Sequence, residues 1–284
     1  MKVGLALSGG GIRGLAHAGV LKALEENNIK IDIIGGTSAG SMVASLYAIG
    51  YKPEEIYREF KENSNKIIGK GKFSILNGVK TLINYKSGLS KGFKNGQGIE
   101  EVFENLANQK NIDKISKIKM PIVIPSVDIK DSKEYIFTNK IPIGEGEEKY
   151  ITDITVGKAV RASSSFPAVF NLCNINSHAF MDGGALNNVP VVEVRKQGAD
   201  KVIAVKFEGD KIDETSSVMD IVMKTIDIMG NKIIEEELNS SDYIVNICTE
   251  KMGLLEINKL KECYQIGYDT VIKNIDKIKK IIEN

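Results

Sequence analysis

Apolar runs of strand length alternate with helical apolar patterns along the first 50 residues of the chain. Residues 2–8, KVGLALS, and residues 31–34, IDII, are short and mainly apolar, which predicts buried strands. A helix is expected after each, and the second runs from about Ala39 to Ile49. The first helix places these residues on one face: Leu15, Ala18, Leu21 and Leu24. Strand, helix, strand and helix with short connections indicate an α/β fold with a parallel sheet.

The same alternation returns after residue 120. Further apolar runs predict strands at 120–129, 133–139, 179–182, 201–207 and 243–247. Helical patterns lie at 152–165, 189–198, 216–238 and from about 256 onward. The last segment is lysine-rich and has isoleucines three apart: Ile272, Ile275, Ile278 and Ile281. It is either a helix docked on the sheet or an interfacial membrane contact, and docking is the expectation.

Residues 53–110 have a different character. Residues 53–63 and 98–108 predict helices, whereas residues 85–98 are rich in glycine and lysine and predict a loop. The region has too few apolar residues for a core of its own, so we expect a cap or lid inserted into one domain spanning 1–284. Its apolar residues either line a groove for a substrate tail or pack in the core: Ile67, Ile68, Phe73, Ile75 and Leu76.

Composition narrows the class of protein. The 284 residues include 42% apolar and 26% charged residues, and 38 Lys plus Arg balance 37 Asp plus Glu. This balance gives no electrostatic reason to expect nucleic-acid binding. The opening apolar run is too short for a signal peptide, and no run approaches the roughly 20 residues of a membrane span. Cys173, Cys248 and Cys263 are widely spaced, which predicts buried reduced thiols in a cytoplasmic protein. With two histidines, a histidine-based zinc site is not expected.

Residues 35–42, GGTSAGSM, join the second predicted strand to the helix that follows it. Gly36, Ser38 and Gly40 fit G-x-S-x-G, in which a serine stands at the apex of a strained strand-to-helix turn. Glycines remove side chains that would clash in such a turn, and the helix N-terminus favours developing negative charge. A turn of small residues packed against a helix is the alternative, but the flanking strand and helix are those that a nucleophile turn requires.

A second glycine-rich segment, GGGIRG from Gly9 to Gly14, follows the first predicted strand. Consecutive glycines let backbone N–H groups converge on an oxyanion or a phosphate. Arg13 adds a charge that either orients the loop or meets an anionic head group. The segment also fits the dinucleotide fingerprint G-x-G-x-x-G, but the acidic residue expected at the end of the second strand is missing, since Asp32 stands at its start. No G-K-[ST] follows, so a Walker P-loop is excluded.

A nucleophilic serine needs a base. His17 lies between alanines in the first predicted helix, which indicates a packed histidine. Along an extended strand His178 would stand roughly 13 Å from Asp182, too far for a direct hydrogen bond, so His178 is expected at the surface. Asp182 itself ends a short strand and precedes Gly183 and Gly184. An aspartate in a plain turn is the alternative. A Ser–Asp pair is chemically reasonable, because desolvation raises the pKa of a carboxylate and makes it a better base.

GGGIRG, GTSAG and DGG, in this order and with ASSSFP at 162–167 and NNVP after DGG, resemble the patatin-like phospholipase family. The resemblance covers roughly residues 3–208, and the chain looks like a bacterial, single-domain member. It implies a three-layer α/β/α sandwich around a mostly parallel sheet. It also implies a serine acyl hydrolase with Ser38 as nucleophile and Asp182 as base, without metal or cofactor. By position, the oxyanion loop would hold Gly9, Gly10, Gly11 and Gly14, with Arg13 beside it.

The family's substrates are acyl lipids, so the resemblance implies a lipid partner and transient contact with a membrane surface. Two other functions remain open from the sequence. One is an acyltransferase or thioesterase that uses the same acyl-enzyme. The other is a non-catalytic lipid-binding protein, against which the intact Ser38 and Asp182 speak.

Overall fold

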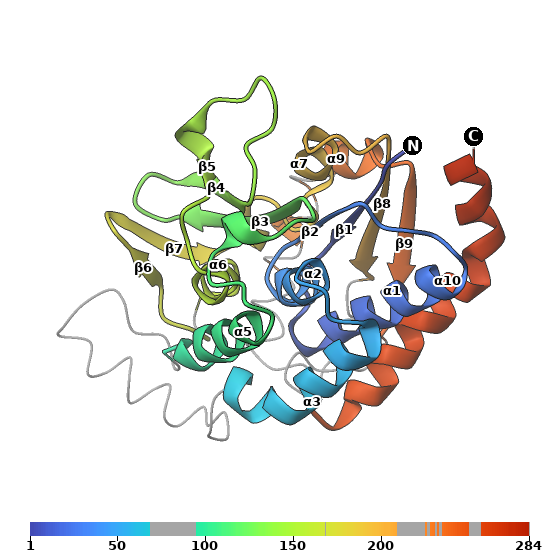
Figure 1. Cartoon of the computed structure of the whole chain (residues 1–284), viewed down its shortest axis with the longest axis horizontal. Helices are drawn as coiled ribbons and strands as arrows, with labels where there is room; N and C mark the ends of the chain where they lie inside the picture. The colour runs from blue at the N-terminus through green and yellow to red at the C-terminus, as the bar shows by residue number, and fades with distance from the viewer. Residues whose placement is uncertain are drawn as a thin grey trace.

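The computed structural model describes residues 1–68, 95–167, 169–208, 225, 228–230, 232, 235–249 and 257–283. Within them one sheet has the strand order β5-β4-β3-β2-β1-β8-β9, and β7 pairs with β3 and β6 (Figure 1). The strands are β1 Val3–Leu7, β2 Ile33–Gly36, β3 Ile122–Asp128, β4 Lys133–Thr138, β5 Tyr150–Ile151, β6 Cys173–Ile175, β7 His178–Asp182, β8 Lys201–Phe207 and β9 Tyr243–Ile247.

The centre of the sheet is parallel. β1 pairs with β2 and β8, β2 pairs with β3, and β8 pairs with β9, all in parallel. Antiparallel pairs join β3 to β4, β3 to β7 and β6 to β7. The mostly parallel sheet predicted from the sequence is therefore confirmed. The short strands β5 and β6 were not predicted, because two or three residues carry no periodic signal.

Helices cover both faces of the sheet. They are α1 Ala16–Glu26, α2 Ala39–Ala48, α3 Pro53–Ile68, α5 Gln97–Gln109, α6 Val156–Ser163, α7 Val191–Lys196, α9 Glu235–Asn239 and α10 Leu260–Glu283. Leu5 and Leu7 of β1 pack in a core with α1, α2 and α10, whereas Ala6 packs in a second core with α7 and α9. Alternate residues of one strand thus reach opposite helix layers, as a three-layer α/β/α sandwich requires. Figure 1 shows α7 and α9 apart from the larger helix group.

The region predicted as a lid is described at its two ends. α3 and α5 bury Ile56, Phe60 and Phe103 in the larger core. Ile67 is buried in the same core and Ile68 is half-buried against it. The other groove candidates, Phe73, Ile75 and Leu76, lie outside the described residues, so the lid stays a prediction.

The C-terminal helix is docked, as expected, but chiefly on α1 and only to a lesser extent on β9 of the sheet. A side chain on Gly19 would come within 1.9 Å of the Tyr264 carbonyl oxygen, and one on Gly267 within 1.9 Å of the Ala16 carbonyl oxygen. The two backbones therefore touch where each helix carries a glycine. Among the isoleucines spaced three apart, Ile278 is buried and Ile272 is exposed, so the docked face depends as much on small residues as on that pattern.

One prediction about the cysteines was wrong. Cys173 and Cys263 are buried, but Cys248 is exposed. Cys248 directly follows β9, whose last residue Ile247 faces the core. Because side chains alternate along an extended chain, the next residue points outward.

Candidate active site

Ser38 stands in the turn between β2 and α2. Its φ of 53° is left-handed, a strained conformation for a residue with a side chain. The turn is tight: a side chain on Gly36 would lie 2.3 Å from the Gly40 carbonyl oxygen, and one on Gly40 would lie 2.4 Å from the Leu7 carbonyl oxygen. Both glycines of G-x-S-x-G are therefore required by close backbone contact. The Ser38 N–H donates to Ser163 Oγ at 3.0 Å.

Asp182 ends β7 opposite Ser126 of β3 and is only 4% exposed. Its Oδ1 accepts the Gly184 N–H at 2.9 Å, whereas the buried Oδ2 has no hydrogen-bond partner among the described residues. Burial raises the pKa of Asp182 to about 6. The Ser38 hydroxyl opposes this shift because it lies against the carboxyl, although the pair lacks the geometry of a formed hydrogen bond. The structure thus brings together the two residues that the sequence singled out.

The loop after Asp182 has no room for side chains near the strand. A side chain on Gly183 would lie 2.4 Å from the Pro125 carbonyl oxygen. The Leu186 and Asn187 N–H groups both donate to the Gly183 carbonyl oxygen, at 3.1 and 2.8 Å. The chain therefore turns sharply, and the predicted glycine turn is present.

The glycine loop lies against the nucleophile turn. A side chain on Gly9 would meet Ser38 Cβ at 3.2 Å, and one on Gly14 would meet Ala39 Cβ at 2.4 Å. The Gly9 N–H donates to Asn188 Oδ1 at 3.0 Å, so this N–H is already engaged. Gly11 has a φ of 59° and is exposed. The loop that the sequence predicted as an oxyanion site is therefore adjacent to Ser38.

Arg13 is buried beneath this loop. Its Nε donates to the Gly10 carbonyl oxygen at 3.2 Å, and its guanidinium lies 5.5 Å from the centre of the Phe207 ring. The sequence left two roles open for Arg13. These contacts favour the one that orients the loop, because a guanidinium held inside the fold has little freedom to meet a lipid head group.

Neither histidine is in hydrogen-bond contact with the two candidate catalytic residues in the part of the chain that the structure describes. His17 Nε2 donates to the Ser8 carbonyl oxygen at 2.8 Å, and burial lowers its pKa to about 4, so the ring is neutral. His178 Nδ1 lies 2.7 Å from Asp128 Oδ2. The packed histidine predicted at position 17 is confirmed. His178 was expected at the surface, but it is half-buried beside a carboxylate.

Several polar residues support the site without having been assigned a role from the sequence. Ser163 accepts from the Ser38 N–H at 3.0 Å, and the Ser165 carbonyl oxygen accepts from the Asp182 N–H at 3.1 Å. Thr37 Oγ1 donates to the Asn187 carbonyl oxygen at 2.8 Å. Ser163 and Ser165 lie in the ASSSFP stretch, which is part of the family resemblance. A hydrogen bond from a serine to a distant part of the backbone leaves no local pattern in the sequence.

The described residues contain neither a metal-binding cluster nor a membrane-spanning helix. No three or more of their His, Cys, Asp and Glu side chains are arranged to hold a metal ion. Nor does any helix among them combine the length and apolarity needed to cross a bilayer.

Comparison with known proteins places the chain among lipid-hydrolase relatives. The model of the patatin-like phospholipase family matches residues 5–195. Lysophospholipase NTE1 of Candida albicans is 33% identical over 93% of this chain, and that of Kluyveromyces lactis is 31% identical over 94%. The chain covers only 19% and 18% of those two proteins.

A solved structure supports the same fold. The crystal structure of VipD from Legionella pneumophila matches 97% of this chain and 67% of its own chain, with a TM-score of 0.52 and 15% identity. Such low identity shows the fold alone. The family model, which spans more than half of the chain and includes both Ser38 and Asp182, shows that this chain belongs to the patatin-like phospholipase family.

Proposed function

We propose that the protein is a serine acyl hydrolase that cleaves fatty acyl esters of lipids through Ser38 and Asp182. The observation that carries the proposal is the pairing of a strained, half-buried serine with a buried carboxyl whose pKa is raised to about 6. A base is most effective when its pKa lies near the working pH. The family and the name of the fungal relatives support a lipid ester, with a lysophospholipid as the first substrate to try.

Catalysis would run in two steps through an acyl-enzyme. Ser38 Oγ attacks the carbonyl carbon of the acyl ester while Asp182 Oδ2, which has no other hydrogen-bond partner among the described residues, takes the hydroxyl proton. The tetrahedral intermediate collapses, and Asp182 returns the proton to the leaving alcohol. Asp182 then takes a proton from water, which attacks the acyl-enzyme. Collapse of this second intermediate releases the fatty acid, and the proton returns to Ser38.

The oxyanion would be held by backbone N–H groups of the glycine loop. Because the Gly9 N–H is engaged by Asn188, Gly10 and Gly11 are the proposed donors, with Gly9 and Gly14 keeping the loop against Ser38 and Ala39. Removal of one such donor lowers kcat by about 10²–10³ in other serine hydrolases.

A lipid substrate also bears on where the protein acts. Acyl lipids reside in membranes, so we propose transient contact with a membrane surface. The cytoplasmic location expected from the sequence remains a prediction. Since the chain spans less than a fifth of the two fungal relatives, their activity is a guide to the substrate class and not a description of this protein.

Labelling of the serine tests the proposal. Wild type, Ser38→Ala and Asp182→Asn would be treated with a fluorophosphonate probe and assayed on a lysophospholipid and a nitrophenyl ester, each with and without EDTA. Ser45→Ala is the matched control, because Ser45 is buried in α2, the helix that follows Ser38, and donates to the Met42 carbonyl oxygen. We expect loss of label and turnover in Ser38→Ala, strong reduction in Asp182→Asn, and no effect of Ser45→Ala or EDTA.

Two results would redirect the proposal. A folded wild type with no label and no turnover would overturn constitutive hydrolysis and favour a lipid-binding role. Ser38-dependent labelling with product formed only when glycerol or coenzyme A is present would indicate an acyltransferase on the same acyl-enzyme.

A further inference from the structure

The loop from Gly183 to Asn188 contacts each part of the candidate site. Gly184 N–H donates to Asp182 Oδ1, the Asn187 carbonyl oxygen accepts from Thr37 beside Ser38, and Asn188 Oδ1 accepts from Gly9. Any displacement of this loop would therefore change how the carboxyl, the nucleophile turn and the glycine loop lie relative to one another.

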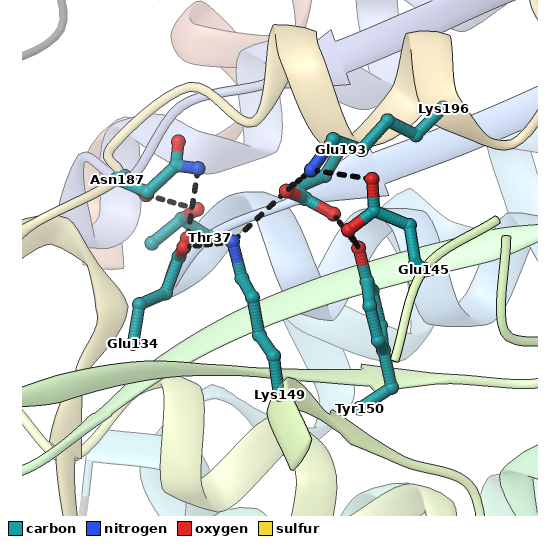
Figure 2. A network of polar contacts seen from close by, with 8 residues as sticks. All are labelled: Thr37, Glu134, Glu145, Lys149, Tyr150, Asn187, Glu193 and Lys196. Carbon is teal, nitrogen blue, oxygen red and sulfur yellow. Dashed lines mark hydrogen bonds and ion pairs between the residues drawn. The ribbon is translucent and has the colours of Figure 1, made fainter. Parts of the chain in front are cut away.

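The side chain of Asn187 leads away from the site into a charged network. Its Nδ2 donates to Glu134 Oε1 at 2.9 Å (Figure 2). A carboxylate can only accept, so the amide nitrogen must be the atom that faces Glu134. Asn187 is buried, and this contact ties the loop to strand β4 on the far side of β3.

A single lysine connects this contact to the helix that follows the loop. Lys149 Nζ lies 2.5 Å from Glu134 Oε2 and 2.9 Å from Glu193 Oε1 of α7. Figure 2 shows Lys149 between the two carboxylates. The loop is therefore held at Asn187 and again at α7, and both attachments meet at the Glu134–Lys149 pair.

We propose that Glu134 is a positioning residue for catalysis, which acts through Asn187 to hold the loop whose Gly184 N–H fixes the Asp182 carboxyl beside Ser38. This inference rests on the proposed hydrolase function. Glu134 contacts neither Ser38 nor Asp182 by any described hydrogen bond, so its effect passes through the loop. The rate of ester hydrolysis by a serine nucleophile depends steeply on such alignment, because a misplacement of the reacting groups by about 1 Å can lower the rate about 10²-fold.

The same network supplies a matched control. Glu145 is a carboxylate at its outer end, where it pairs with Lys196 at 3.2 Å and both side chains are about one-third exposed. Figure 2 shows Glu145 on the side of Glu193 away from Asn187. Glu145→Gln removes the same charge from the network without touching the loop.

The experiment compares Glu134→Ala, Glu134→Gln and Glu145→Gln with wild type. The readouts are the rate of fluorophosphonate labelling across pH, kcat and KM on a nitrophenyl ester, and the melting temperature. Glutamine keeps an acceptor for Asn187 Nδ2, whereas alanine removes it. We expect Glu134→Ala to lower kcat and the labelling rate about tenfold or more, with KM little changed and the acid limb of the pH profile displaced. Glu134→Gln should stay within about threefold of wild type and Glu145→Gln within about twofold.

The outcomes separate this inference from the function on which it rests. If wild type is labelled at Ser38 and Glu134→Ala matches Glu145→Gln in rate and pH profile, positioning by Glu134 is overturned and the hydrolase stands. If the loss in Glu134→Ala equals its unfolded fraction, the residue is only structural. If wild type is not labelled while folded, both proposals are overturned.

Discussion

Asp182 and Glu193 are two carboxylates with almost equal burial and opposite electrostatics. They are 4% and 3% exposed. No cation lies within hydrogen-bond reach of Asp182 among the described residues, and burial raises its pKa to about 6. Glu193 is also desolvated, but Lys149, Tyr150 and Lys196 bond it, and these partners hold its pKa below the usual range. Burial therefore raises the pKa of a carboxyl, and makes it a better base, only where no neighbouring cation compensates.

This contrast separates a group kept for proton transfer from one kept for structure. Asp182 has a free lone pair beside a serine hydroxyl and can take a proton near neutral pH. Both Glu193 carboxylate oxygens accept hydrogen bonds, from Lys149, Lys196 and Tyr150, so this carboxylate holds the network together.

The largest expected effect is on turnover. Asp182→Asn removes the proposed base and should lower kcat by about 10²–10⁴. Glu193→Gln should change kcat only a few-fold, because it alters the supporting network and not the reacting groups. Steady-state hydrolysis of a nitrophenyl ester measures both. Equal losses of kcat in the two variants would contradict a catalytic role that is particular to Asp182.

Removal of Lys149 should instead act on stability. Lys149→Met leaves the Glu134 and Glu193 carboxylates close together without their shared cation, which we expect to destabilise the fold by about 3 kcal/mol. Urea unfolding at pH 7 measures this. Lys158→Met, on the exposed side of α6, serves as the control and should stay within about 0.5 kcal/mol of wild type.

Asp182→Asn should stabilise the protein at high pH. The folded-state pKa of Asp182 is raised from 3.8 to about 6, so the folded protein holds this proton more tightly than the unfolded chain. That advantage is present below pH 4 and is lost as pH rises through 6, which leaves an ionised, desolvated group that weakens the fold by up to about 3 kcal/mol. Unfolding of wild type and variant at pH 8 and pH 5 should show the gap narrowing at pH 5. A constant gap would contradict the shift.

The smallest effect is expected from replacement of His178. Activity should fall below a pH of about 6 as Asp182 takes up a proton. His178→Asn should leave that acid limb in place and kcat within about threefold, because His178 pairs with Asp128 and not with the site. A pH–rate profile of both proteins checks this. Disappearance of the acid limb in His178→Asn would assign it to the imidazole.

The sequence predicted more of the candidate site than of the polar network that supports it. Strand and helix patterns predicted the parallel centre of the sheet, and G-x-S-x-G with DGG identified Ser38 and Asp182, which the structure places side by side. Those features are local: a turn between a strand and a helix, and a carboxylate at a strand end. The roles of both residues remain proposals.

The network around Glu134 and Lys149 was not predictable in the same way. It depends on the antiparallel pairing of β4 with β3 and on the two-residue strand β5, neither of which leaves a periodic pattern. The bond from Asn188 to Gly9 joins residues 179 positions apart. Such contacts form only in the assembled fold. A single sequence shows the two residues of each bond, but no local pattern shows that they pair.

The glycine contact between α1 and α10 bears on the order in which the molecule is assembled during synthesis. α1 emerges from the ribosome before α10, and the surface around Gly19 is covered only when Tyr264 and its neighbours have been made, some 245 residues later. Until then the nascent chain lacks the helix that covers this face of α1. Contacts so distant in sequence form slowly and leave intermediates prone to aggregate. Chaperone dependence should therefore centre on this late step, and a bulky residue at Gly19 should block it.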